Sequence, residues 1–143
     1  MKSIVVPIDD DRSSDWVVNH VVPLYHQAPL RIYLLNVQPV LSRYVARFIP
    51  ASELHDYHQE NGLRVLQPVM AKLDAAGVPH IDRVLVGRKA ETIVQFARTC
   101  RCDQIILPSQ TPSLLSNLGL GSISSQIRHL IGVGAGCDIC EVC

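Results

Sequence analysis

The chain has 143 residues, 48% of them hydrophobic, which suits a single domain over residues 1–143 with a buried core and argues against disorder. Its 13 basic and 13 acidic residues balance, and a chain without basic blocks is a poor candidate for binding nucleic acid or an anionic membrane. No apolar run approaches the ~20 residues of a spanning helix, and the first run is too short for a signal peptide. We therefore expect a cytoplasmic protein whose five cysteines are thiols rather than disulfides.

The first part of the chain predicts a strand, a helix and a second strand. Residues 3–9, SIVVPID, form a continuous β-branched run, which is typical of a strand buried on both faces. Val17 and Val21 then recur at helical spacing, and residues 30–37, LRIYLLNV, predict another buried strand.

The middle of the chain predicts a long connection followed by a long helix. Residues 38–52 show no clear period, which indicates a connection with room for a short helix. Residues 53–76 have helical spacing, but Gly62 and Pro68 fall inside them. These two residues predict a kink or a division into two helical segments.

The last part of the chain alternates between strand and helix signals. Apolar runs predict strands, and residues spaced three and four apart predict helices. The strands are expected at residues 80–87, 103–108 and 137–143, and the helices at residues 90–97 and 122–131.

Strands that alternate with helices predict an α/β fold with a doubly wound parallel sheet. We expect five strands in the order 3-2-1-4-5, with helices on both faces. Ligands of such sheets bind at the carboxyl ends of the strands, near the point where the strand order reverses. The loops after Ile8, Val37, Val86 and Leu107 are therefore the expected place of a site, with the loop 108–121 at this edge.

An acidic turn follows the first predicted strand. Asp9, Asp10 and Asp11 could hold a cation or a ligand hydroxyl or amine, or form a solvated turn that caps the next helix. A receiver domain also begins with an apolar strand and paired acids, but it needs an aspartate at the end of a later strand. Asp56 lies in a segment with helical spacing, and no Lys-Pro pair ends a later strand, which disfavours that class.

A Gly-Ser step precedes the last predicted helix. Gly121 and Ser122 could present backbone N–H groups and the positive end of the helix dipole to an anion. A plain serine N-cap after a flexible glycine explains the same residues.

Together these segments resemble the universal stress protein family over nearly the whole chain. The resemblance rests on IVVPID, LLNV, VLVGRKAETIVQFA and DQIILPS…LGLGSISSQI. It implies an adenine nucleotide alpha-hydrolase-like fold, with a base placed against the acid after the first strand and a valine after the second. The family-matched nucleotide-binding positions are Pro7, Asp9, Val37, Leu107, Pro108, Thr111, Gly121, Ser122 and Ile123.

The loop departs from the pattern of nucleotide-binding members, which place glycines where Pro108 and Thr111 stand here. Proline has no N–H to donate, and the branched Thr111 hinders close approach to phosphate. Asp10 and Asp11 add negative charge near the expected mouth. We therefore predict a small regulatory or stress-response protein that is not catalytic and binds ATP weakly or not at all. The alternative is an ATP-binding member with slow hydrolysis, and the candidate cofactors are ATP or AMP with Mg²⁺.

The cysteines and histidines support a further alternative. Cys137, Cys140 and Cys143 form C-x-x-C-x-x-C, which could ligate a metal or sense redox state from a loop. On a strand their side chains would alternate between faces, and buried small hydrophobes are then the simpler interpretation. His55 and His58 share a helical face and are interpreted as surface histidines.

The partner prediction comes from the same resemblance. Members of the family commonly dimerise by pairing their last strands antiparallel, so we expect a homodimer through residues 139–142, with a protein partner also conceivable for a regulatory protein. The serines have no evident His/Asp arrangement, so no catalytic residues are predicted.

Overall fold

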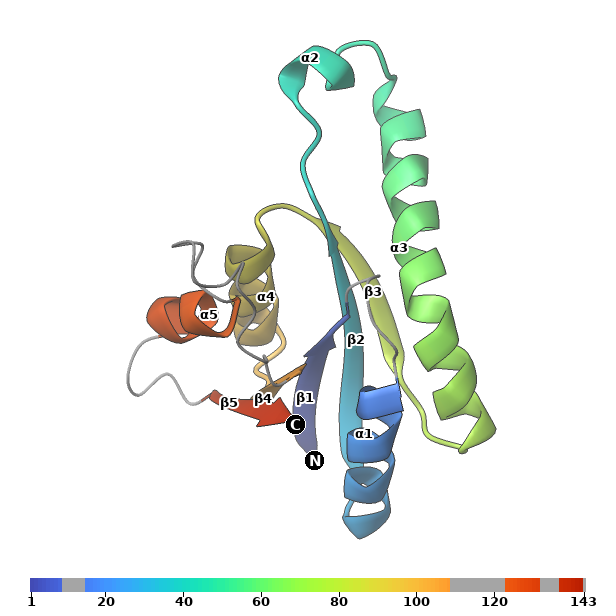
Figure 1. The fold of residues 1–143 in the computed structure, drawn as a ribbon, viewed down its shortest axis with the longest axis vertical. Helices are drawn as coiled ribbons and strands as arrows, with labels where there is room; N and C mark the ends of the chain where they lie inside the picture. The colour runs from blue at the N-terminus through green and yellow to red at the C-terminus, as the bar shows by residue number, and fades with distance from the viewer. Residues whose placement is uncertain (9–14, 109–122, 132–136, 143) are drawn as a thin grey trace, which may run out of the picture.

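Five strands form one sheet in which all neighbouring pairs are parallel (Figure 1). The computed structural model describes residues 1–8, 15–108, 123–131 and 137–142. The predicted α/β fold with a parallel sheet and helices is confirmed. The sheet order is β3-β2-β1-β4-β5. The strands are β1 (Lys2–Pro7), β2 (Leu30–Gln38), β3 (Ile81–Val86), β4 (Gln104–Pro108) and β5 (Asp138–Val142).

Helices cover both faces of this sheet. In Figure 1, α1 and α3 lie on one side and α4 and α5 on the other, while the short α2 lies beyond the carboxyl end of β2. None of the helices in the described parts of the chain has the length and apolar character needed to cross a membrane. The helices are α1 (Asp15–Gln27), α2 (Arg43–Ala46), α3 (Ala51–Ala75), α4 (Lys89–Thr99) and α5 (Ile123–Ile131).

The sheet separates two hydrophobic clusters, which explains why its first strand has no polar face. Ile4 and Val6 of β1 pack with α1 and α3, whereas Val5 packs with α4 and α5. Because successive side chains of a strand point to opposite faces, a central strand covered on both sides must be apolar throughout. All three of these side chains are fully buried.

The long helix α3 is continuous from Ala51 to Ala75, so the predicted division into two segments at Gly62 and Pro68 is wrong. Gly62 is buried against the sheet, where an added Cβ would lie 2.3 Å from Val84 Cγ1. It is therefore needed for the close approach of helix and sheet. Pro68 is exposed, and the packing of the neighbouring turns keeps the helix continuous despite the missing N–H.

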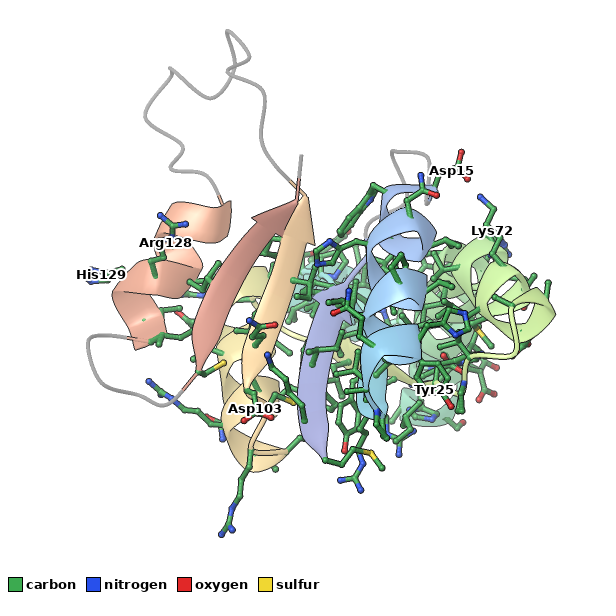
Figure 2. All side chains as sticks on the ribbon, turned by 90° about the horizontal axis from the view of Figure 1, so that it is seen from below. Asp15, Tyr25, Lys72, Asp103, Arg128 and His129 are labelled. Atoms are coloured by element: carbon green, nitrogen blue, oxygen red, sulfur yellow. The ribbon has the colours of Figure 1, made fainter. Side chains whose placement is uncertain are left out.

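The amino ends of β1 and β4 are joined by a reciprocal pair of hydrogen bonds. The Ser3 N–H donates to Asp103 Oδ2 at 2.8 Å, and the Asp103 N–H donates to the Ser3 carbonyl at 2.8 Å. Figure 2 shows Asp103 at this end of the sheet, with Asp15 of α1 and Lys72 of α3 near each other elsewhere on the surface. The Lys72–Asp15 ion pair is largely exposed and contributes little to stability.

Candidate functional site

The carboxyl ends of β1 and β4 diverge, and a proline accounts for this. β1 pairs with β2 as far as Pro7 and Leu35, but its pairing with β4 ends at Val5 and Ile105. The Ile8 N–H donates to the Leu35 carbonyl on β2, so the backbone groups of the preceding residue point toward β4. That residue is the buried Pro7, which has no N–H to give to β4. The pairing therefore stops where the strand order reverses, which is where parallel α/β sheets bind ligands.

A buried asparagine ends the pairing between β1 and β2. Asn36 is 4% exposed, and its Nδ2 donates to the Ile8 carbonyl at 2.9 Å. Its Oδ1 accepts a hydrogen bond from Gln38 Nε2 at 2.6 Å. In a continuing parallel ladder, that carbonyl would be the acceptor for the Val37 N–H. The side chain of Asn36 thus takes the place of the next ladder bond.

Val37 consequently lies beyond the end of the β1–β2 pairing. The carbonyl of Gln38 accepts from the N–H of Gly87, the residue after β3. Because the backbone groups of successive strand residues point to alternate sides, those of Val37 point toward β1. Its N–H and C=O form a donor–acceptor pair at the carboxyl edge, while its half-buried side chain packs with the α4–α5 cluster. This arrangement suits recognition of the edge of a planar heterocycle.

The phosphate side of the predicted site is described in part. Leu107 is buried in β4, Pro108 is the last residue of that strand, and Ile123 is the first residue of α5. The ends of β4 and of β1 are thus both prolines, neither of which can donate a backbone hydrogen bond. Asp9, Asp10, Asp11, Thr111, Gly121 and Ser122 lie outside the described residues.

His58 is the main departure from the sequence-based prediction. It was expected at the surface, but it is 4% exposed, and its Nδ1 has no hydrogen-bond partner among the described residues. His55 of the same helix is exposed, as predicted. The buried residues of α3 recur every three or four positions from His58 through Gly62 and Leu66. This periodicity, extended back from Leu66, could have placed His58 on the sheet-facing side.

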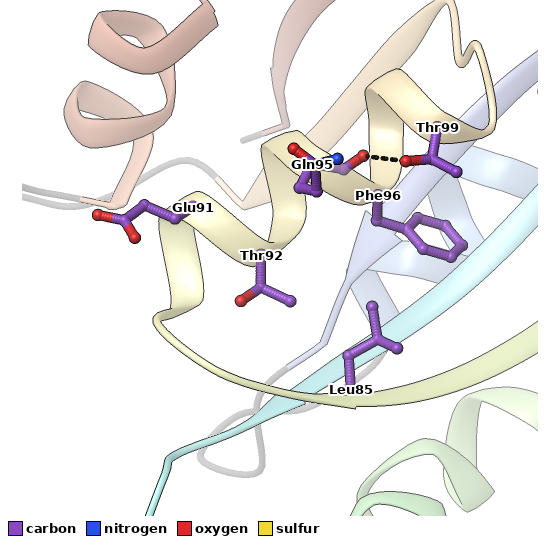
Figure 3. Close-up of a pocket in the computed structure, with 6 residues that line it drawn as sticks. All are labelled: Leu85, Glu91, Thr92, Gln95, Phe96 and Thr99. Atoms are coloured by element: carbon purple, nitrogen blue, oxygen red, sulfur yellow. Dashed lines mark hydrogen bonds between the residues drawn. The ribbon is translucent and has the colours of Figure 1, made fainter.

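A separate open pocket of about 470 Å³ lies between α4 and Leu85 of β3 (Figure 3). Its polar side chains do not converge on a common point. Thr99 Oγ1 donates to the Gln95 carbonyl at 2.8 Å, within the helix itself. None of the predicted nucleotide-binding residues lines it, so we place the site at the carboxyl edge and not here.

Three cysteines are brought together at the amino end of the sheet, far from this edge. Cys102 is buried, while Cys100 and Cys137 are half-buried. Burial, followed by the two neighbouring thiols, raises the pKa of Cys102 to about 12. Within the described residues, no group of three or more His, Cys, Asp or Glu side chains could hold a metal ion. Cys140 lies in β5, and Cys143 lies outside the described residues.

Solved structures with the same fold cover almost the whole chain. A universal stress protein family member from Burkholderia pseudomallei is 20% identical, with a TM-score of 0.67 over 98% of this chain and 94% of that one. The Archaeoglobus fulgidus protein in complex with dAMP is 15% identical, with a TM-score of 0.65 over 100% and 98% of the two chains. The Arabidopsis thaliana protein with AMP bound is 18% identical, with a TM-score of 0.61 over 99% and 91%.

Comparison with curated proteins gives no significant sequence match. The sequence model of the universal stress protein family, in contrast, matches residues 1–131, which include β1 to β4 and the helices α1 to α5 that the structure describes. The chain therefore belongs to the universal stress protein family.

Proposed function

We propose that this protein binds an adenine nucleoside or nucleotide at the carboxyl edge of its sheet, mainly through the base and sugar, and acts as a small non-catalytic regulator. The observation that carries the proposal is the end of the β1–β2 ladder. Asn36 takes the Ile8 carbonyl, and the N–H and C=O of Val37 lie next to the gap that this leaves. A neighbouring donor and acceptor match the edge of adenine, which offers a ring nitrogen beside an amino group.

The relatives support the same ligand class. The Archaeoglobus fulgidus and Arabidopsis thaliana proteins were solved with dAMP and AMP. Both ligands carry adenine, a sugar and a single phosphate, so neither has the β- and γ-phosphates of ATP.

The phosphate side supports weak binding of a triphosphate. β4 ends in Pro108, whose nitrogen carries no hydrogen. Thr111 replaces a second glycine of the family pattern, and Asp10 and Asp11 add negative charge to the sequence near the mouth. A missing donor to a buried oxygen costs ~1–3 kcal/mol. A total loss of ~3 kcal/mol would weaken a micromolar site about a hundredfold, so we expect a dissociation constant for ATP above ~100 μM.

Isothermal titration with adenosine, AMP and Mg²⁺-ATP tests the proposal. Adenosine and AMP should bind at least as well as ATP to the unaltered protein. Changing Pro108→Gly and Thr111→Gly together should strengthen ATP binding by about tenfold or more, because each change restores a backbone able to approach phosphate. The same pair should change adenosine binding little. Pro79→Gly, before β3 at the other end of the sheet, controls for the loss of a proline.

Two results would overturn parts of the proposal. Tight ATP binding by the unaltered chain would show that the serines and threonines of the loop replace the glycines, and slow hydrolysis of ATP would then become the function to test. No binding of adenosine or AMP at millimolar concentration would remove the nucleotide function itself.

A further inference from the structure

The sheet-facing side of α3 carries a histidine whose Nδ1 has no hydrogen-bond partner in the part of the chain that the structure describes. His58 is 4% exposed, and its Nδ1 makes no hydrogen bond. The rings of Tyr57 and His58 pack in a T-shaped arrangement, with ring centroids 5.4 Å apart. Buried polar atoms are nearly always paired, so an unpaired one in a native protein calls for an explanation.

The position of His58 can be read from its neighbours on the helix. One turn away, Gly62 lies directly against Val84, which pairs with Asn36 of β2. A helix rises ~6 Å in four residues, and a strand rises ~6.6 Å in two. Because α3 runs antiparallel to the strands, His58 lies level with Val86 and Gln38, the last residues of β3 and β2.

Neighbouring side chains show that His58 lies inward from the edge of the sheet. Gln59, the next residue, donates through Nε2 to the Val84 carbonyl at 3.2 Å. β3 is the last strand on that side of the sheet. The Gly87 N–H bonds to the Gln38 carbonyl of β2. Because successive strand residues point their backbone groups to alternate sides, those of Val84 point away from β2. Gln59 thus covers the outer edge of β3. His58 shares the buried face of α3 with Gly62 and Leu66 and faces the sheet itself.

Among the described residues, the polar groups level with His58 on this face of β2 are the uncharged amides of Asn36 and Gln38. Asn36 and Gln38 point to the same face of β2 as Leu34, which packs with α1 and α3. Their amides are linked to each other and to the Ile8 carbonyl. β4, after which a phosphate would bind, lies on the far side of β1 in the strand order. A neutral heterocycle therefore suits the surroundings of His58 better than a phosphate does.

We propose that His58 is a specificity-determining residue whose Nδ1 hydrogen-bonds to the base of the nucleotide held at Val37. This inference rests on the proposed function. It adds a contact from α3 to a site that is otherwise built from strand ends and the loops that follow them. Without ligand, Nδ1 of the buried imidazole has no partner among the described residues, and the base would provide one.

Two measurements on His58→Leu test this role together. The change should weaken adenosine binding by about tenfold, the usual size of one lost hydrogen bond to a ligand. It should also leave the ligand-free protein at least as resistant to urea, because it removes an unpaired polar atom. A purely structural histidine would give the opposite pattern, with lower stability and adenosine affinity unchanged. His55→Leu, one turn earlier and exposed, is the matched control and should alter neither quantity.

A spectroscopic readout separates this inference from the proposed function. In protein labelled with ¹⁵N-histidine, adenosine should shift the Nδ1 resonance of His58 and leave that of His55 in place. Adenosine binding with an unchanged His58 resonance, or with unchanged affinity in His58→Leu, would overturn the role of His58 and leave the nucleotide function standing. Absence of adenosine binding to the unaltered protein would overturn both.

Discussion

The contact between Gly62 and Val84 sets how closely α3 approaches the sheet, and it can be tested by substituting both residues. A Cβ added at Gly62 would lie 2.3 Å and 2.5 Å from the two γ carbons of Val84, whereas carbon atoms in contact are ~3.5–4.0 Å apart. Overpacking of this kind costs ~1–3 kcal/mol. Alanine also favours a helix over glycine by ~1 kcal/mol, so the two effects of Gly62→Ala oppose each other.

We expect the overlap to be the larger effect, because the atoms that clash belong to a short branched side chain on a strand. Gly62→Ala should then lower the free energy of unfolding by about 1 kcal/mol. Val84→Ala alone should cost ~1.6 kcal/mol or more for the two methyl groups removed. In the Val84→Ala background the clash with both γ carbons is gone and only the contact with the Cβ of residue 84, at 3.0 Å, stays tight, so Gly62→Ala should become stabilising by no more than ~0.5 kcal/mol.

Urea unfolding followed by circular dichroism, on the four proteins of this double-mutant cycle, measures the change of sign. Ala71→Gly, at an exposed position of the same helix, gives the helix-propensity difference without any contact to the sheet. If Gly62→Ala has the same effect in both backgrounds, the close approach of α3 to Val84 is refuted. The placement of His58 beside Val86 and Gln38, which was derived from this contact, would then lose its support as well.

Three further predictions concern other parts of the chain. Burial alone would lower the pKa of His80, but hydrogen bonds of 2.7 Å to Asp74 and Asp82 outweigh it and raise the pKa above 6.5. The stabilisation from the charged imidazole should therefore be present below that value and disappear as pH rises through the folded pKa, so urea unfolding curves of the unaltered protein and His80→Gln should converge at alkaline pH. Burial raises the pKa of Cys102 to about 12, so iodoacetamide at about pH 8 should label this thiol only after unfolding. Mass spectrometry can identify the labelled residue, and labelling of Cys102 in the native protein would contradict the prediction. Since β5 is the last strand of the sheet order, residues 139–142 should pair between two chains, and light scattering at micromolar concentration should give a dimer rather than a monomer.

The fold could be predicted from the sequence because its signals are local. The runs before Pro7 and Gln38 are rich in apolar residues, and the helices between strands keep an apolar spacing of three and four. The continuity of α3 could not be predicted in the same way. Within the helix Gly62 resembles a break, and only the side chain of Val84, on another element, shows that the missing Cβ is a packing requirement.

The candidate site was predictable only where a single residue type carries the chemistry. Pro108 lacks an N–H wherever it is placed, so its effect on a phosphate loop follows from sequence. Asn36 was not singled out, although a polar residue in the apolar run LLNV is a signal. Its role depends on the Ile8 carbonyl of another strand. The burial of His58 likewise depends on how far α3 extends along the sheet.

The half of the site that would bind the base and the half that would bind the phosphates are formed by different parts of the chain. The base half is formed by strand ends, where Pro7 stops the pairing with β4 and Asn36 stops the pairing with β2. These residues are buried, so changing them would leave unpaired polar groups or cavities in the core. The phosphate half depends on the sequence that follows β4, where threonine at position 111 in place of the family's glycine hinders close approach of the backbone to phosphate. A change in the loop can therefore alter the response to the number of phosphates and leave recognition of the base in place. Combining Asn36→Ala with the Pro108→Gly and Thr111→Gly pair should separate the two halves, because the first change should weaken adenosine and ATP by the same factor, whereas the pair should alter ATP alone.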